Sequence, residues 1–125
     1  MKTGNRDLDR LVSALLRHYE FVFAQYQREC SAAGVIATTS ELAQRLIRNR
    51  STFSRTFSKV TGKHLLAVMR LRQLKDAERL IRTTNLPIAE VARRCAFGPV
   101  QSTFARAFHA VYGMSPREYR RRSKK

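Results

Sequence analysis

A seven-residue segment occurs twice in the chain, and this repeat limits the fold more than any other feature. Residues 51–57 read Ser-Thr-Phe-Ser-Arg-Thr-Phe and residues 102–108 read Ser-Thr-Phe-Ala-Arg-Ala-Phe, so five of the seven positions are identical at a period of 51. A glycine follows the last phenylalanine of each copy by five residues, at Gly62 and Gly113. The repeat predicts one structural unit that is built twice.

The residues around each copy predict a helix-turn-helix. Ahead of the two copies stand Glu41-Leu42-Ala43 and Glu90-Val91-Ala92, each on a short apolar period that is typical of a helix. The alanine of each triplet is small enough for two helices to cross closely. Two phenylalanines four residues apart anchor the inner face of each second helix, namely Phe53 with Phe57 and Phe104 with Phe108.

The opposite face of each second helix is polar and basic, as contact with base edges and phosphates requires. The first unit offers Arg50, Ser51, Ser54 and Arg55, and the second offers Gln101, Ser102, Ala105 and Arg106. Arginine can bind guanine with two hydrogen bonds and glutamine can bind adenine in the same way, so both side chains suit base recognition.

The remaining segments predict an all-α fold of about seven helices, in which a long linker helix joins two helix-turn-helix subdomains. An amphipathic pattern covers Leu8 to Tyr26, a capping box begins at Thr38, and a linker helix of about 27 Å covers Leu65 to Arg82. Pro87 suits a first helical turn, and Ser115 opens a second capping box with proline at the next position. We place an N-terminal helix and connector at 1–37 and a DNA-binding domain at 38–125, divided into 38–62, 63–84 and 85–125.

The charge is concentrated where the repeat lies. Residues 1–37 hold five basic and four acidic side chains, a net of +1, whereas residues 38–125 hold twenty basic and five acidic ones, a net of +15. A net positive charge of this size favours a polyanionic partner. Duplex DNA is one such partner, because it carries one negative charge per about 1.7 Å of its axis. Charge alone leaves a membrane surface or RNA open.

Other classes of function have little support in the sequence. Cys30 and Cys95 are isolated thiols, and the three histidines lack metal-ligand spacing, so we expect no metal site and no cofactor. We find no nucleotide-binding loop, nucleophile elbow or HExxH motif, and we expect no enzyme. No apolar run is long enough to cross a membrane, and the polar start has no signal-peptide core, so we expect a cytoplasmic, nucleoid-associated protein.

From about residue 38 to residue 120 the chain resembles the DNA-binding domain of the AraC/XylS family of bacterial regulators, in particular its short members of the MarA type. The resemblance rests on the double motif, on Arg70-Leu71-Arg72 in the linker helix, on residues 88–108, and on the closing Tyr112-Gly113-Met114-Ser115-Pro116-Arg117-Glu118-Tyr119-Arg120. It implies binding to double-stranded promoter DNA over two adjacent groove segments and contact with RNA polymerase.

Through this resemblance we assign base contacts to Ser51, Ser54, Arg55, Gln101, Ser102 and Arg106. We expect phosphate contacts from Arg50, Lys59, Arg72 and Arg120. The chain departs from the family where Ile47 and Ala96 stand in place of turn glycines, and where one extra residue between Phe97 and Phe104 shifts the start of the second recognition helix. Its N-terminal helix is also longer than the short members need.

Three interpretations of function stay open at this point. The first is a sequence-specific transcriptional regulator, the second is an architectural DNA- or RNA-binding protein that does not distinguish sequences, and the third is a protein-interaction module localised by its basic domain. The amphipathic segment Leu8–Tyr26 either packs on the rest of the chain or pairs with a second copy or a partner. The operator sequence and the choice between activation and repression do not follow from the residues.

Overall fold

The computed structural model describes residues 6–48 and 62–124, with side chains described for residue 10, residues 12–48 and residues 65–124. This part of the chain is all-α, as predicted, and contains six helices. They are α1 (Arg6–Ala33), α2 (Thr39–Arg48), α3 (Gly62–Thr83), α4 (Ile88–Arg94), α5 (Gln101–Tyr112) and α6 (Pro116–Ser123). The seventh helix, which we expected near residues 50–59, lies outside the described residues.

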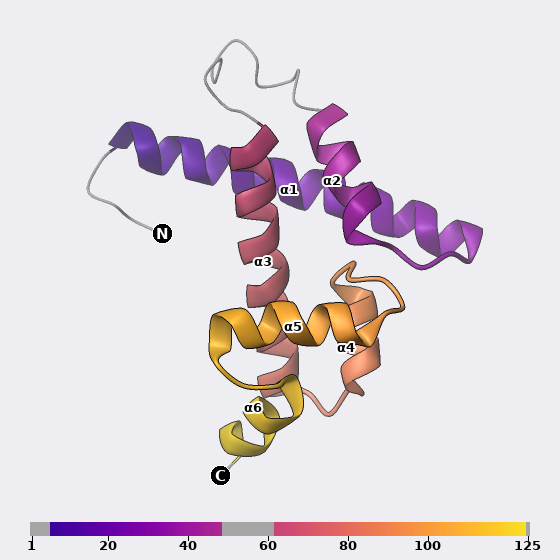
Figure 1. The fold of residues 1–125 in the computed structure, drawn as a ribbon. Coiled ribbons are helices and arrows are strands. Elements are labelled where there is room, and N and C mark those ends of the chain that lie inside the picture. Colours follow the sequence, from indigo (N-terminus) through magenta and orange to yellow (C-terminus); the bar gives the residue numbers. More distant parts are fainter. Residues whose placement is uncertain (1–5, 49–61, 125) are drawn as a thin grey trace.

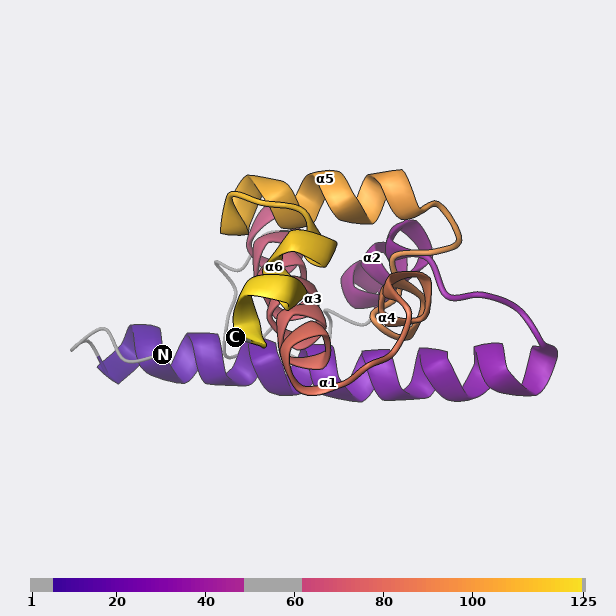
Figure 2. The ribbon, with the colours of Figure 1, turned by 90° about the horizontal axis from the view of Figure 1, so that it is seen from below.

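The linker helix α3 is the axis of the molecule. In Figure 1 it crosses both α1 and α5. Figure 2, turned by 90°, shows α3 almost end-on, with α5 on one side of the molecule and α1 on the opposite side. The exposed side of α5 therefore faces away from the long N-terminal helix.

Local sequence signals place most helix ends correctly. Thr38 Oγ1 accepts a hydrogen bond from the Glu41 amide at 3.2 Å, and Ser115 Oγ accepts one from the Glu118 amide at 3.2 Å, as capping predicts. Gly113 ends α5 with a φ of 74°, a left-handed conformation that glycine adopts without strain.

Two helix ends differ from the prediction. The linker helix α3 begins at Gly62, three residues before the predicted start at Leu65. Pro87 is the N-cap of α4, one position before the first helical turn. The first change is of three residues and the second of one, whereas assignments of helix ends usually differ by one or two residues.

Two hydrophobic cores lie along α3. The first joins α1, α2 and the upper part of α3 through Tyr19, Val22, Tyr26, Cys30, Ala37, Leu42, Leu46, Met69 and Ala96. The second joins the lower part of α3 to α4 and α5 through Leu74, Ala77, Ile81, Val91, Ala92, Cys95, Phe97, Phe104 and Phe108. Because one continuous helix contributes to both cores, α3 determines the separation of the two units.

The N-terminal helix packs on the rest of the chain. Tyr19, Val22 and Tyr26 of α1 are buried in the first core against Leu42 and Leu46 of α2. His18 Nε2 lies 3.0 Å from the carbonyl oxygen of Leu46, near the end of α2, where helix carbonyls lack intrahelical partners. Of the two alternatives for this helix, packing in cis is therefore observed. Pairing with a second copy stays untested.

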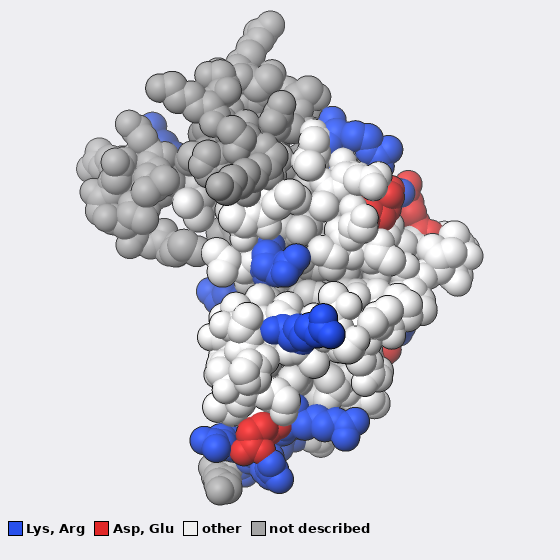
Figure 3. Space-filling view, in the orientation of Figure 1, with Lys and Arg blue, Asp and Glu red and all other residues white. Residues whose placement is uncertain are grey.

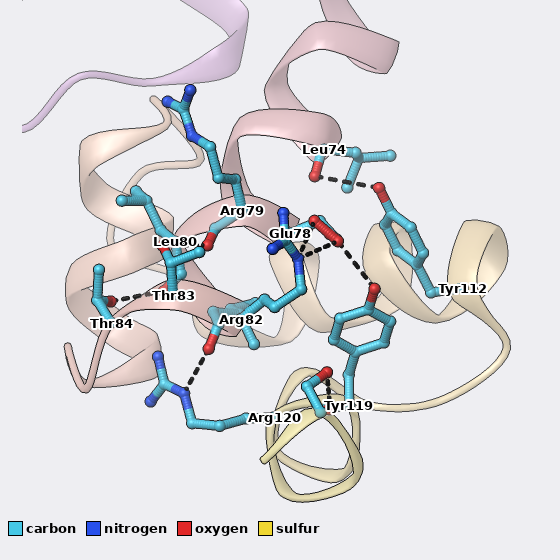
Figure 4. A network of polar contacts seen from close by, with 12 residues as sticks. Leu74, Glu78, Arg79, Leu80, Arg82, Thr83, Thr84, Tyr112, Tyr119 and Arg120 are labelled. Atoms are coloured by element: carbon cyan, nitrogen blue, oxygen red, sulfur yellow. Dashed lines mark hydrogen bonds and ion pairs between the residues drawn. The ribbon is translucent and has the colours of Figure 1, made fainter. Parts of the chain in front are cut away.

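The C-terminal helix α6 is hydrogen-bonded to the last turns of α3 (Figure 4). Tyr119 donates from its hydroxyl to Glu78 at 2.8 Å, and Arg120 donates from Nε to the carbonyl oxygen of Ile81 at 3.0 Å. A cation at this point also interacts favourably with the dipole of α3, whose C-terminal end is partly negative. The closing segment of the sequence thus stabilises the second unit.

Candidate nucleic-acid interface

The second helix-turn-helix is formed by α4, the turn at 95–100 and α5. At the end of α4 the Phe97 amide bonds to the carbonyl of Ala92 at 2.9 Å, and the Ala96 amide bonds to that of Arg93 at 3.2 Å. This pair of bonds is a Schellman motif, which requires a left-handed residue at the position of Ala96. Ala96 has a φ of 64°. The turn therefore keeps the geometry that glycine usually supplies, with a strained alanine in its place.

The recognition helix α5 has one buried face and one exposed face. Phe104 and Phe108 are fully buried in the second core, with ring centroids 5.8 Å apart. This confirms their predicted role in packing. The side chains that point to solvent are Gln101, Ser102, Thr103, Arg106, His109, Ala110 and Val111. Arg106 lies two residues from each phenylalanine and so projects from the side opposite them.

The extra residue in the turn does not remove the predicted contact residues from this helix. The segment Gly98-Pro99-Val100 precedes α5, Val100 is its N-cap, and Gln101 is its first residue. Gln101, Ser102 and Arg106 all lie on α5 and are all exposed. Ser102 and Arg106 are four residues apart and so share one face, one helical turn from each other.

Among the side chains that the structure describes, every acidic one is paired with an arginine. The pairs are Glu20 and Asp76 with Arg72, Glu29 with Arg45, Glu41 with Arg45 and Arg48, Glu78 with Arg82, Glu90 with Arg93 and Arg94, and Glu118 with Arg121 and Arg122. The bond from Arg93 lowers the pKa of the Glu90 carboxyl, which keeps that carboxylate charged. The acidic groups are thus neutralised locally.

In the described part of the chain, Arg106 is one of the cations whose side chain makes neither an ion pair nor a hydrogen bond within the protein. The others are Arg10, Arg17, Arg28, Arg70, Lys75, Arg79 and Arg117, and all are exposed. On the face that carries α5, Lys and Arg side chains reach the surface over the middle, and acidic side chains appear only near the margins (Figure 3). An anion can approach Arg106 without displacing an internal partner.

Comparison with known proteins gives a family for this geometry. A family model described as "Helix-turn-helix domain" matches residues 42–122, which include α4, the strained turn, α5 and α6. The chain belongs to the AraC/XylS family of helix-turn-helix proteins.

Three relatives of this AraC/XylS-family chain carry the names of transcriptional regulators. The HTH-type transcriptional activator AarP of Providencia stuartii is 34% identical over 80 residues, which cover 64% of this chain and 58% of AarP. The RCS-specific HTH-type transcriptional activator RclR of Escherichia coli is 29% identical over 99 residues, which cover 79% of this chain and 34% of RclR. The probable transcriptional regulator LumQ of Photobacterium leiognathi is 29% identical over 119 residues, which cover 95% of this chain and 44% of LumQ. No solved structure matches the chain.

The chain spans less than two-thirds of the length of each of these relatives. The names of the relatives describe proteins that are longer than this one. The match places this chain among helix-turn-helix proteins.

The predicted contact residues of the first unit lie outside the described residues. These are Arg50, Ser51, Ser54, Arg55 and Lys59, together with the anchoring Phe53 and Phe57. The structure does describe α2, the first helix of that unit, with Leu42 and Leu46 fully buried.

Two of the expected phosphate contacts, Arg72 and Arg120, take part in bonds within the chain. Arg72 donates to Glu20 at 2.8 Å and to Asp76 at 3.0 Å, and its guanidinium lies 5.8 Å from the centre of the Tyr19 ring. The bond to Glu20 raises the pKa of the Arg72 guanidinium. Arg72 joins α3 to α1, and Arg120 joins α6 to α3. A phosphate contact from either residue stays a prediction.

Sequence reasoning missed a buried glutamine between the two units. Gln73 is 0% exposed and occupies the apolar stripe of α3, four residues from Met69 on one side and from Ala77 on the other. A polar residue at the centre of an apolar stripe is the signal that could have found it, because a buried amide needs hydrogen-bond partners.

Other kinds of site have no support in the described residues. No helix there is long and apolar enough to cross a membrane. No group of three or more histidine, cysteine or acidic side chains in this part of the chain could hold a metal ion. Cys30 and Cys95 are both free and buried.

Proposed function

We propose that the chain regulates transcription by binding a specific sequence in double-stranded promoter DNA, with two recognition helices in adjacent segments of the major groove. The observation that carries the proposal is the exposed face of α5. Two buried phenylalanines fix the helix, and Gln101, Ser102 and Arg106 project from it into solvent. The major groove admits an α-helix, and these side chains have the donors that base edges accept.

The other recognition helix, that of the first unit, is the repeated segment near residues 51–57, for which we propose base contacts from Ser51, Ser54 and Arg55. The linker helix α3 has 22 residues. At 1.5 Å per residue it is about 33 Å long, close to the length of about 34–36 Å of one turn of DNA. Two recognition helices separated in this way can enter successive major-groove segments on one side of a duplex. Arg50, Lys59, Arg72 and Arg120 are the proposed phosphate contacts.

The names of the relatives support a role at promoters. AarP and RclR are named as transcriptional activators, and LumQ as a probable regulator. We therefore propose that this chain also contacts RNA polymerase when it is bound to DNA. It would act at the nucleoid, in the cytoplasm of a bacterium, and the proposed activity requires neither a cofactor nor catalysis.

Selection of bound sequences from a pool of random duplexes tests this proposal. We expect a site with two conserved blocks whose centres lie about 10–10.5 base pairs apart. Enrichment of no sequence at all would instead support an architectural protein that binds by charge. A single block would show that only one unit recognises bases.

The dependence of affinity on salt tests the electrostatic part. We expect the logarithm of the binding constant to fall linearly with the logarithm of the salt concentration, with a slope of about −0.9 for each phosphate contacted. Affinity that does not change with salt would contradict a role for the excess positive charge of +15 in residues 38–125.

A further inference from the structure

The turn of the second helix-turn-helix is hydrogen-bonded to three other helices. The last carbonyl groups of α4 and its turn have no intrahelical partners, because the amides that would bond to them lie beyond the helix end. The carbonyl of Arg94 accepts from Gln27 of α1 at 2.8 Å. The carbonyl of Cys95 accepts from Gln73 of α3 at 2.9 Å, and that of Ala96 accepts from Thr39 of α2 at 2.8 Å.

Gln73 and Thr39 also bond to each other. The Gln73 amide Nε2 lies 3.2 Å from Thr39 Oγ1 and 3.4 Å from the carbonyl oxygen of Ala96. We call Thr39, Gln73, Cys95 and Ala96 the junction. Thr39 is the first residue of α2 and belongs to the first unit, whereas Cys95 and Ala96 form the turn that leads to α5. The junction therefore links the first unit directly to the turn that precedes α5.

Apart from the bond of Gln27 to the carbonyl of Arg94, the rest of the contact is apolar and less directional. Ala96 is buried in the first core, while its neighbours Cys95 and Phe97 are buried in the second. Apolar surfaces tolerate small shifts against each other, since the hydrophobic effect has no direction. Hydrogen bonds weaken steeply once distance or angle departs from the optimum, so the junction permits only one relative position.

We propose that Gln73 and Thr39 are positioning residues that fix α5 relative to the first unit, and so set the spacing between two half-sites that the protein accepts. This inference rests on the proposed function, since it assumes two recognition helices on one duplex. Neither residue needs to contact DNA, because both side chains point into the protein.

Two linked binding modules gain affinity only when both can bind at the same time. The gain over one module is about 10²–10⁴-fold when the link fits the spacing, and it disappears when the geometry forbids simultaneous binding. One extra base pair moves a half-site by about 3.4 Å and rotates it by about 35°. If the two units are held rigidly, most of the affinity gained from binding both half-sites is lost at the altered spacing. If the units can move relative to each other, the gain in affinity is smaller at the natural spacing but is kept after the insertion.

The test measures the dissociation constant on three duplexes at one salt concentration. They carry the selected two-block site, the same site with one extra base pair between the blocks, and one block alone. For the natural chain we expect the insertion to weaken binding at least tenfold and close to the level of one block. For Gln73→Leu and for Thr39→Val, which remove the donors at similar side-chain volume, we expect the insertion to weaken binding by less than threefold.

Two further variants separate positioning from stability. Thr39→Ser keeps the hydroxyl group, and we expect it to restore the spacing dependence of the natural chain. Ile81→Val removes one buried methylene group from the second core without touching the junction, and we expect it to lower the melting temperature while the effect of the insertion stays at least tenfold. Melting temperatures of all variants are measured in parallel.

The outcomes distinguish the two proposals. A pool that yields no two-block site overturns both. If a two-block site is found and the junction variants show the same spacing dependence as the natural chain, the positioning role is wrong and the proposed function stands. It is equally wrong if Ile81→Val loosens the spacing as much as Gln73→Leu does.

Discussion

The hydroxyl of Tyr119 in α6 donates a hydrogen bond of 2.8 Å to the carboxylate of Glu78 in α3, two residues that lie 41 positions apart in the chain. Arg82 bonds to the same carboxylate at 3.3 Å. Burial, together with this bond, raises the pKa of the Tyr119 hydroxyl, so the donor keeps its proton well into the alkaline range. The contact fastens the closing helix to the linker helix, on which α5 also packs.

Removal of the Tyr119 hydroxyl tests how much this contact contributes to the stability of the protein. Tyr119→Phe keeps the ring and leaves Glu78 without one donor, and we expect the free energy of unfolding to fall by about 1–2 kcal/mol. Tyr112→Phe is the matched control, because its hydroxyl lies 3.5 Å from the carbonyl of Leu74, at the limit of hydrogen bonding. Urea unfolding should show a change within about 0.5 kcal/mol for the control. Equal losses in the free energy of unfolding for both variants would show that the Tyr119 hydrogen bond contributes no more to stability than that of Tyr112.

Phe104 is expected to be the main anchor of the recognition helix. It is fully buried, so Phe104→Ala should lower the free energy of unfolding by about 3–5 kcal/mol through lost burial and a cavity. Val111→Ala, on the same helix at a side chain that is 52% exposed, should change stability by less than about 0.5 kcal/mol. A thermal melt that Phe104→Ala leaves unchanged would remove this residue from the core.

Ala96, the left-handed residue of the turn, should be replaceable by glycine with little loss of stability. A left-handed conformation costs a non-glycine residue about 1–2 kcal/mol, which Ala96→Gly relieves. The lost methyl burial and the added freedom of the unfolded chain oppose this gain by a similar amount. We expect Ala96→Gly to change the free energy of unfolding by less than about 0.5 kcal/mol.

The comparison for this variant is Ala92→Gly, at a buried residue inside α4 with no such strain to relieve. It should cost about 1–2 kcal/mol, since helix propensity and methyl burial are both lost. Chemical denaturation of the two variants side by side measures the difference. Equal destabilisation by both would contradict strain at Ala96.

Local signals in the sequence were sufficient for much of the fold. Ser115 with Pro116 fixes the start of α6, and Gly113 fixes the end of α5, because caps and left-handed terminators depend only on neighbouring residues. The four-residue spacing of Phe104 and Phe108 likewise identified the buried face of α5 and, by difference, its exposed face. Each of these features depends only on residues that lie within one or two helical turns of each other.

Features that depend on tertiary packing could not be predicted in the same way. The position of Ala96 in a left-handed turn follows from the Schellman motif and from donors on α1, α2 and α3, none of which is adjacent in sequence. Arg72, an expected phosphate contact, instead bonds to Glu20, which lies 52 residues away in the chain. Pairing across such distances is set by the fold and leaves no local pattern.

Cys95 predicts a loss of stability in alkali. Burial, with a smaller contribution from the Asp76 carboxylate, raises the pKa of the Cys95 thiol to about 12. Since the unfolded thiol loses its proton near pH 8.5–9, the stabilisation is complete below that pH and is lost as the pH rises toward 12. Between pH 8 and pH 10.5 this one group should account for a loss on the order of 2 kcal/mol, at a side chain that is 3% exposed.

The control for this prediction is Cys95→Ala, which removes the titrating group. We expect the variant to be less stable than the natural chain at pH 8 but to lose less stability between pH 8 and pH 10.5. Urea midpoints at the two pH values give the difference directly. If both proteins lose stability equally, the decline belongs to the tyrosines and not to Cys95.

The central claim is that α5 recognises bases, and Arg106→Ala tests it most directly. Arg17→Ala is the matched control, because Arg17 is also exposed and unpaired but lies on α1, on the opposite side of the molecule. Dissociation constants are measured on the selected duplex and on a random one at the same salt concentration. We expect Arg106→Ala to weaken specific binding by about 1–3 kcal/mol and random binding far less, while Arg17→Ala changes neither by more than about 0.5 kcal/mol. Equal loss on both duplexes for Arg106→Ala would make this residue a phosphate contact and would contradict base recognition by α5.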